Sequence, residues 1–299
     1  MRASVIIPSY NSEATIRACL RSVCAQDLGS PYEVFVFDSG TDGTAAIVER
    51  EFPGVILMRA SQKTDPARGR NRAVAASTGA VLAFIDSDCI AEPDWLQRLC
   101  TLIESGYDGA GGAIAPVNGS SDAAWAGYFT EFREFLPGGS PRAATYLTIN
   151  NAAYRRDTFL RAGGFPEDYF PQEDQVFWTR LHPLGARIVM DPSIVVQHHH
   201  RTEAGAFLRH QYTIGLANAR VVLALGLQGT ALASRPALAL LALPLLTSYR
   251  FARTCAACWR QERAILLRRP SIGVLCWLGM WWWGAAFVRG SRAALRSAA

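Results

Sequence analysis

The sequence has few charged residues, and its last third has almost no acidic ones. Charged residues make up 18% of the 299 positions and apolar residues 50%, against about 25% and about 45–50% in a typical soluble domain. This composition excludes an intrinsically disordered chain and favours contact with a membrane. The length is sufficient for one large domain or two small ones with a sizeable core.

The charge is unevenly distributed along the chain. Residues 201–299 carry 13 arginines against Glu203 and Glu262, a net charge of +11, which leaves −6 for residues 1–200. A basic segment that alternates with apolar runs is typical of a surface that meets anionic lipid. We therefore expect membrane lipid, and no nucleic acid, as a partner.

Several common motifs are missing. The seven cysteines have no regular spacing, which excludes a disulfide framework, and the CxxC at 255–258 lacks the second pair that structural zinc requires. The apolar stretch at the N-terminus is too short for a signal peptide, so we expect the catalytic part in the cytosol. The first predicted strand runs into Ser9-Tyr10-Asn11, with no glycine-rich loop. The absence of this loop argues against a nicotinamide enzyme and against a sugar-phosphate nucleotidylyltransferase.

Residues 3 to about 115 alternate between short β-rich runs and amphipathic segments. This alternation is typical of βαβ units and predicts an α/β fold with a mostly parallel sheet. We predict strands at 5–7, 33–37, 55–58 and 80–85, a helix that opens near Ser12, and a helix over 66–78 capped by Asp65. The helix after Ser12 should bury Ile16, Cys19, Leu20 and Val23. Residues 116–149 are expected to form loops and short helices around a substrate pocket.

Polar side chains follow three of the predicted strands. Asn11, Asp38 and Asp86 each lie where a strand ends, and parallel strands present their carboxyl ends at one edge of the sheet. Asp86-Ser87-Asp88 places two carboxylates on one turn. Carboxylates of this kind hold Mg²⁺ or Mn²⁺ together with substrate phosphates.

Four segments in this order resemble the family 2 glycosyltransferases, whose GT-A fold is a Rossmann-like, mostly parallel sheet flanked by helices. The resemblance covers roughly residues 3–220 and is carried by VIIPSYN at 5–11, DSGTDGT at 38–44, ARGRN at 67–71 and DSD at 86–88. It implies that Pro8, Asn11 and Asp38 line a nucleoside pocket, with Asp86 near the ribose. It also implies that Asp88 binds a metal, Mn²⁺ or Mg²⁺, which holds the donor diphosphate.

A catalytic base is predicted further along the chain. Asp174 in FPQED at 170–174, preceded by GGF at 163–165, resembles the Glu-Asp motif beside the acceptor in this family. An acceptor hydroxyl must lose a proton as it attacks, and one carboxylate opposite the leaving group gives a single displacement with inversion. The chain departs from the family at Val176, where many members carry another acid, and this weakens any prediction about the acceptor.

Three further residues are candidates for the donor site. Arg68 and Arg180 could neutralise the diphosphate. His198 follows a strand-like run at 194–196, and the resemblance implies that a histidine near this place can complete the metal site. Imidazole suits Mn²⁺ better than Mg²⁺.

The C-terminal region contains three uncharged runs, at 221–234, 236–249 and 270–288. The last, of 19 residues, approaches the length of a membrane span. A connector with six arginines separates the second and third runs, and the positive-inside rule favours the cytosol for it. We therefore predict helices that dip into one leaflet or lie in the interface, and a domain boundary between 1–220, the catalytic domain, and 221–299, the membrane-associated helices.

Together these observations predict an inverting, metal-dependent glycosyltransferase at the cytosolic face of the inner membrane. It would transfer a sugar from a nucleotide-sugar donor, a UDP- or GDP-sugar, to a lipid-linked saccharide acceptor in surface polysaccharide biosynthesis. A polyprenyl-phosphate monoglycosyltransferase and a non-catalytic GT-A membrane module are alternatives. A processive synthase is disfavoured because no Gln-x-x-Arg-Trp sequence follows the predicted base.

Overall fold

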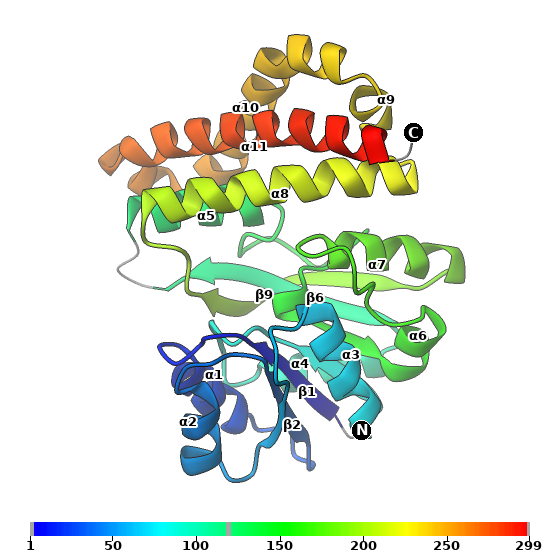
Figure 1. Cartoon of the computed structure of the whole chain (residues 1–299). Coiled ribbons are helices and arrows are strands. Elements are labelled where there is room, and N and C mark those ends of the chain that lie inside the picture. The colour runs from blue at the N-terminus through cyan, green and yellow to red at the C-terminus, as the bar shows by residue number, and fades with distance from the viewer. Residues whose placement is uncertain (1–2, 118–120, 298–299) are drawn as a thin grey trace. The chain divides into compact units, whose positions relative to one another are not determined.

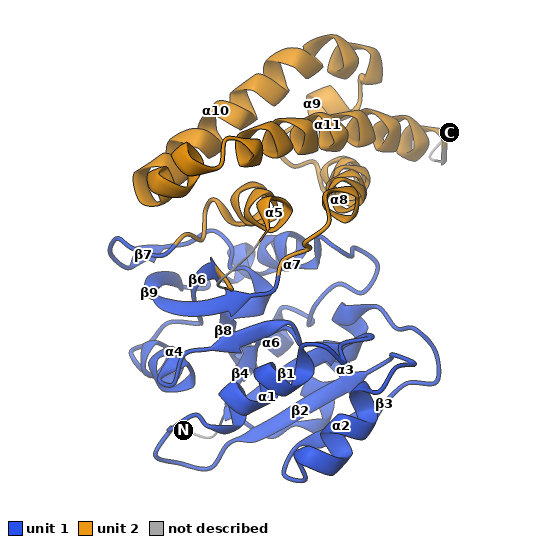
Figure 2. Cartoon of the chain, turned by 90° about the vertical axis from the view of Figure 1, so that its left-hand side faces the viewer, with its two compact units in different colours: residues 1–115, 137–199 blue, residues 116–136, 200–299 orange. Residues whose placement is uncertain are grey.

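The computed structural model describes residues 3–117 and 121–297. The chain forms two compact units, shown in blue and orange in Figure 2. Unit 1 comprises residues 1–115 and 137–199, and unit 2 comprises residues 116–136 and 200–299. The expected boundary was at residue 220. The observed division differs because the helices over 122–132 and 204–225 both pack against the C-terminal helix.

Unit 1 is built on a nine-stranded mixed sheet with the order β3-β2-β1-β4-β8-β6-β9-β5, in which β7 also pairs with β9 (Figure 1). Its β1, β2, β3 and β4 pair in parallel, while β8, β5 and β7 join by antiparallel pairing. The strands are β1 Ala3–Ser9, β2 Glu33–Asp38, β3 Ile56–Arg59, β4 Val81–Phe84, β5 Cys89–Ala91, β6 Gly109–Pro116, β7 Arg142–Ala143, β8 Ala152–Arg155 and β9 Ile188–His198. The α/β fold class and the four predicted strands are confirmed.

The helices of unit 1 include the two predicted from the sequence, although the one expected to open near Ser12 begins at Ile16. They are α1 Ile16–Cys24, α2 Thr44–Glu51, α3 Pro66–Ala76, α4 Trp95–Glu104, α6 Arg156–Arg161 and α7 Glu173–Leu181, with short 3₁₀ turns at Ile149–Asn151 and His182–Leu184. The apolar face predicted for α1 is fully buried. Asp65 caps α3, since its Oδ1 accepts a hydrogen bond of 2.8 Å from the Ala67 backbone N–H. Helix α3 packs on β1 and β2, and α4 on β4, β8 and β9.

Four phenylalanines form part of the core of unit 1. Phe84, Phe159, Phe165 and Phe177 are at most 2% exposed, and their rings pack with centroid distances of 4.7 to 5.5 Å. Phe165 belongs to the GGF segment and Phe177 to α7. Because aromatic packing buries a large apolar area, this cluster fixes the start of α7 and the GGF segment against β4.

Unit 2 consists of helices: α5 Asp122–Phe132, α8 Ala204–Leu225, α9 Thr230–Ala233, α10 Pro236–Arg268 and α11 Ser271–Ser297. The run expected as loops and short helices thus contains a helix of 11 residues, α5, capped by the Ser121 hydroxyl. Helix α11 packs against α5, α8 and α10. A Cβ on Gly215 of α8 would lie 2.3 Å from the Trp283 carbonyl oxygen of α11, so the close approach of these two helices requires glycine there.

The arginine-rich connector is helical. The run at 236–249 and the connector form one helix, α10, which has non-helical backbone angles at Glu262. In the described part of the chain, one helix is long and apolar enough to cross a membrane, α11 over Ser271–Arg296, and 44% of its most apolar window is buried inside the protein. Core helices of soluble proteins can share this length and composition.

The core of unit 1 depends on Asn151, which is fully buried. Its Nδ2 donates hydrogen bonds to the Ala113 and Ile194 carbonyl oxygens, at 2.8 and 3.0 Å, and its Oδ1 accepts one of 2.9 Å from Trp95 Nε1.

Asn151→Ala leaves these groups without their partner, and we expect a loss of about 3 kcal/mol in the free energy of unfolding, measured by denaturant titration. The exposed Gln97→Ala on α4 should change it by less than about 0.5 kcal/mol. Equal stability of both variants would contradict this role.

Candidate active site

The predicted donor residues lie together where β1 and β2 end. Ser9 pairs with Asp38, and Pro8 with Phe37, in the parallel register of these strands. Asn11 has a left-handed backbone, with φ of 52°, and its Oδ1 accepts a hydrogen bond of 2.9 Å from the Thr41 backbone N–H. The two loops approach so closely that a Cβ on Gly40 would lie 2.6 Å from the Asn11 backbone nitrogen. Asp38 is buried beside them and accepts from the Gly40 N–H.

The same rim includes the turn after β4. The Ser12 and Ser87 hydroxyl oxygens are 2.7 Å apart, within hydrogen-bond distance, and the Cys19 thiol donates to the Asp86 carbonyl oxygen. These contacts join the loop after β1 to the acidic turn. The structure therefore brings Asn11, Asp38 and Asp86 to one edge of the sheet.

Arg70 is the centre of this rim. Its side chain is 3% exposed, and its Nη2 donates a 2.6 Å hydrogen bond to Asp86 Oδ1 while its Nη1 donates a 3.0 Å bond to Glu173 Oε1. A buried guanidinium is tolerated only when it is paired and hydrogen-bonded. The side chain thus joins α3 to the turn after β4 and to the first residue of α7.

Asn71, the next residue on α3, holds the GGF segment. Its Nδ2 donates to the Phe165 carbonyl oxygen at 2.8 Å, and its Oδ1 accepts from the Phe165 N–H at 2.9 Å. Gly164 has a φ of 69°, and a Cβ there would lie 2.9 Å from Asn71 Oδ1. The glycine is therefore required both by the backbone conformation and by this contact.

The two arginines predicted for the donor site are placed differently. Arg68 is on the exposed side of α3, where its Nε forms an ion pair of 2.8 Å with Glu167. Arg180 is exposed on α7 and its Nη1 donates to the Gly164 carbonyl oxygen at 3.2 Å. Within residues 3–117 and 121–297, neither arginine forms a hydrogen bond or ion pair with the acidic turn, whereas Arg70 does. Arg70 flanks Gly69 as Arg68 does, but it falls on the buried face of α3 with Ala67 and Val74.

Asp88, Cys89 and His198 form a cluster of potential metal ligands. The antiparallel register of β5 and β9 pairs Cys89 with His198, and His198 Nε2 is 3.6 Å from Asp88 Oδ2. One possible ligand atom from each of the three residues lies within 4.8 Å of the others. The Asp88 carboxylate is 41% exposed and open to a ligand, while His198 is nearly buried. An oxygen and an imidazole nitrogen fit Mn²⁺ well, and the buried Cys89 thiol is a poor partner for so hard an ion.

Asp174 lies in the first turn of α7, half-buried and next to Glu173. Burial raises the pKa of Asp174 to about 7, the negative charge of Glu173 adds to this rise, and the Gln175 N–H and Arg70 oppose it. Tyr154 also faces this carboxyl, and burial followed by the charge of Asp174 raises the pKa of its hydroxyl. A carboxyl that titrates near neutral pH can accept a proton under physiological conditions.

Unit 1 combines a polar rim at the strand ends, an acidic turn, and Glu173 and Asp174 at the start of α7. This combination is typical of one class of proteins, the GT-A glycosyltransferases. Residues 4–163 match the family described as Glycosyl transferase family 2. The chain belongs to this family and is a nucleotide-sugar-dependent glycosyltransferase. This assignment excludes the nucleotidylyltransferase alternative.

Known relatives agree with the assignment. Glycosyltransferase AglE of Haloferax volcanii is 29% identical over 226 residues, 73% of either chain. The glucosyl-dolichyl phosphate glucuronosyltransferase of the same organism is 26% identical over 208 residues, 63% of either chain. The solved structure of the mannosyltransferase PcManGT from Pyrobaculum calidifontis, in complex with GDP-Man and Mn²⁺, shares the fold with a TM-score of 0.59 and 20% identity, over 99% of this chain and 87% of that one.

The Arg70 bridge gives a prediction about stability. Arg70→Gln leaves Asp86 and Glu173 facing a neutral group, and we expect the free energy of unfolding to fall by about 3–5 kcal/mol, measured by denaturant titration at neutral pH. Arg68→Gln removes an exposed ion pair two residues away and should cost less than about 1 kcal/mol. A similar loss in the free energy of unfolding in both variants would show that the buried Arg70 bridge contributes no more than the exposed ion pair of Arg68.

Proposed function

We propose that this chain transfers a sugar, with inversion, from a UDP- or GDP-sugar to a lipid-linked saccharide acceptor at the cytosolic face of the inner membrane. The observation that carries the proposal is the Arg70 bridge, which joins Asp86 on the donor rim to Glu173, the neighbour of Asp174. A donor rim and a proton acceptor within one unit are what a single displacement needs.

In the proposed reaction, Pro8, Asn11 and Asp38 bind the nucleoside, and Asp86 lies beside the ribose. Asp88 and His198 would hold Mn²⁺ or Mg²⁺, which as a Lewis acid stabilises the negative charge of the leaving diphosphate.

Asp174 is proposed as the general base. Its carboxylate takes the proton of the acceptor hydroxyl while that oxygen forms a bond to the anomeric carbon and the bond to the diphosphate breaks. The pKa near 7 supports this role, because the carboxylate is then available at neutral pH and basic enough to accept the proton. Attack from the side opposite the leaving group inverts the anomeric configuration.

Two observations support a lipid-linked acceptor and a membrane location. Helix α11 is long and apolar enough to cross a membrane, and one relative is by name a transferase that acts with a glucosyl-dolichyl phosphate. The arginines of residues 201–299 agree with a cytosolic face under the positive-inside rule. We propose that unit 1 carries the chemistry and that the C-terminal helices, residues 221–299, contact the membrane.

A donor screen tests the transferase reaction. The purified full chain, in lipid with Mn²⁺ or Mg²⁺, is mixed with single nucleotide sugars and a membrane lipid extract, and release of nucleoside diphosphate is followed. We expect metal-dependent release with one donor, a loss of this release in Asp88→Ala, and a fall of at least about 100-fold in Asp174→Asn. Asp157→Asn, an exposed acid in the first turn of α6, is the matched control and should keep its activity.

The opposite result has a definite meaning. If nucleotides raise the melting temperature but no donor is consumed, either the lipid extract lacks the acceptor or the chain is a non-catalytic GT-A module. Full activity of Asp174→Asn would remove Asp174 from the role of base.

The pH dependence of the reaction tests the environment of Asp174. The carboxyl must be deprotonated to accept a proton, so kcat/KM should rise with pH through about 7. The groups that face it are Glu173, Arg70 and Tyr154. Glu173→Gln removes a like charge, lowers the pKa of Asp174 and should move the rising limb to lower pH, whereas the exposed Glu49→Gln on α2 should leave it in place. A shift to higher pH in Glu173→Gln would refute the assignment of the limb to Asp174.

A further inference from the structure

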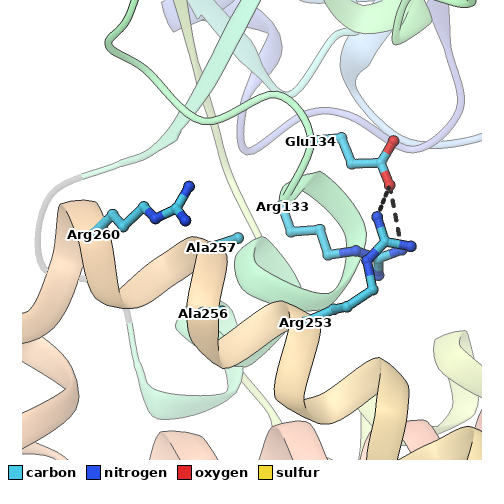
Figure 3. A pocket seen from close by; sticks show the side chains of 6 residues that line it. All are labelled: Arg133, Glu134, Arg253, Ala256, Ala257 and Arg260. Atoms are coloured by element: carbon cyan, nitrogen blue, oxygen red, sulfur yellow. Dashed lines mark hydrogen bonds and ion pairs between the residues drawn. The ribbon is translucent and has the colours of Figure 1, made fainter.

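A basic cavity lies within unit 2, on residues that the reaction above does not use. It has a volume of about 270 Å³ and is lined by Arg133, Glu134, Arg253, Ala256, Ala257 and Arg260 (Figure 3). The last four are three, four and seven residues apart along α10, so they share one face of that helix. We call these six residues the arginine pocket.

The charges of the arginine pocket are incompletely balanced. Glu134 Oε1 lies 3.4 Å from Arg133 Nη2 and 3.6 Å from Arg253 Nη2, so one carboxylate serves two guanidinium groups at long range. Arg260 has no ion pair or hydrogen bond to another residue in the described part of the chain, and Figure 3 shows its guanidinium apart from the Glu134 group. Three arginines against one glutamate leave a net charge of +2 on the lining.

One donor in the pocket is both buried and unused. Arg133 Nε has no hydrogen-bond partner among residues 3–117 and 121–297, although its side chain is only 16% exposed. A buried donor without an acceptor costs free energy, and Nη2 of the same guanidinium lies 3.4 Å from Glu134 Oε1, so the charge of Arg133 is weakly paired. Ala256 and Ala257 keep the space open because their side chains are short.

The chemistry of the pocket selects a class of ligand. Guanidinium groups bind phosphate through paired N–H donors. A phosphate monoester carries about −1.5 to −2 charges at neutral pH, which matches the lining, whereas the phosphodiester of an ordinary phospholipid carries one. The pocket therefore fits a terminal phosphate better than a bridging one.

The surroundings of the pocket indicate that this phosphate is attached to a lipid. Helix α10 carries exposed apolar side chains on both sides of the pocket along the helix, among them Leu241, Leu245, Trp259 and Leu267, which are between 49% and 79% exposed. A basic helix with exposed leucine and tryptophan is typical of contact with a membrane interface.

We propose that the arginine pocket binds the terminal phosphate of a lipid. A lipid-linked saccharide carries its phosphate in a bridging position, so the ligand inferred here is a lipid phosphate that bears no sugar. The inference goes beyond the proposed function and rests on it only for the membrane location.

Vesicle binding by the full chain tests the pocket. Two sets of phosphatidylcholine vesicles are prepared with the same surface potential, one with polyprenyl phosphate and one with phosphatidylglycerol. We expect wild-type protein to prefer the polyprenyl phosphate vesicles by about tenfold in a flotation assay. Arg253→Gln and Arg260→Gln should reduce this preference to near equality. If wild-type protein binds both kinds of vesicle equally, general electrostatic attraction explains the binding and the pocket proposal is overturned.

Arg263→Gln is the matched control. Arg263 lies on α10 and is exposed, but it does not line the pocket. Its loss should weaken binding to both kinds of vesicle alike and leave the preference unchanged. Loss of the preference in this variant would overturn the assignment to the pocket. Arg260→Gln keeps the test valid if Arg253→Gln fails to fold, because no described ion pair is lost.

Glu134→Gln separates binding from a structural role. Removal of the carboxylate frees Arg133 and Arg253 for the ligand, so the preference for polyprenyl phosphate should increase. A structural role of the Glu134 ion pairs predicts a decrease, and that result would count against the proposal.

Inorganic phosphate distinguishes the source of the ligand. Detergent-dispersed polyprenyl phosphate should raise the melting temperature more than inorganic phosphate does at equal concentration, and an equal rise would make this a site for free phosphate and overturn the lipid assignment. These readouts need no sugar transfer. Failure of the donor screen with the vesicle preference intact would refute the proposed function alone, and transfer without the preference would refute the pocket alone.

Discussion

The buried guanidinium of Arg70 is the interaction on which the candidate active site depends. A charge in the interior needs counter-charges at hydrogen-bond distance, and here they come from Asp86 after β4 and from Glu173 at the start of α7. Glu173 is 103 residues away from Arg70 in the sequence. Because one side chain pairs with both carboxylates, it holds the acidic turn and the start of α7 together.

Asn71 and the phenylalanine cluster reinforce this arrangement. Asn71 holds the backbone of Phe165 through two hydrogen bonds, and the ring of Phe165 packs against Phe84 and Phe177. The apolar core and the polar rim thus fix the same segment from two sides. This rigidity is the physical condition for a carboxyl with a raised pKa at Asp174, since a mobile carboxyl would regain contact with water and titrate near its ordinary value.

In unit 2, helix packing decides which basic residues are available to a ligand. Gly215 allows α8 and α11 to approach closely, while α10 leaves many leucines exposed. Arg250, on the same helix, stacks over the ring of Trp283 with 3.9 Å between the guanidinium carbon and the ring centre. Arg253 and Arg260, less than three turns further on, face the cavity instead. Arginines on α10 therefore have different roles, depending on the face of the helix that they occupy.

Local periodicity and the direction of parallel strands were enough to predict the parallel strands, the buried face of α1 and the cap of α3. The strand-end positions of Asn11, Asp38 and Asp86 follow from the same pattern, and motif resemblance identified Asp88, Asp174 and His198 as candidates. Other features became visible only in the folded chain: Arg70 rather than Arg68 reaches the acidic turn, residues 122–132 and 204–225 pack with the C-terminal helices, and three arginines share one cavity. These results depend on contacts between segments far apart in the chain, which no local pattern encodes.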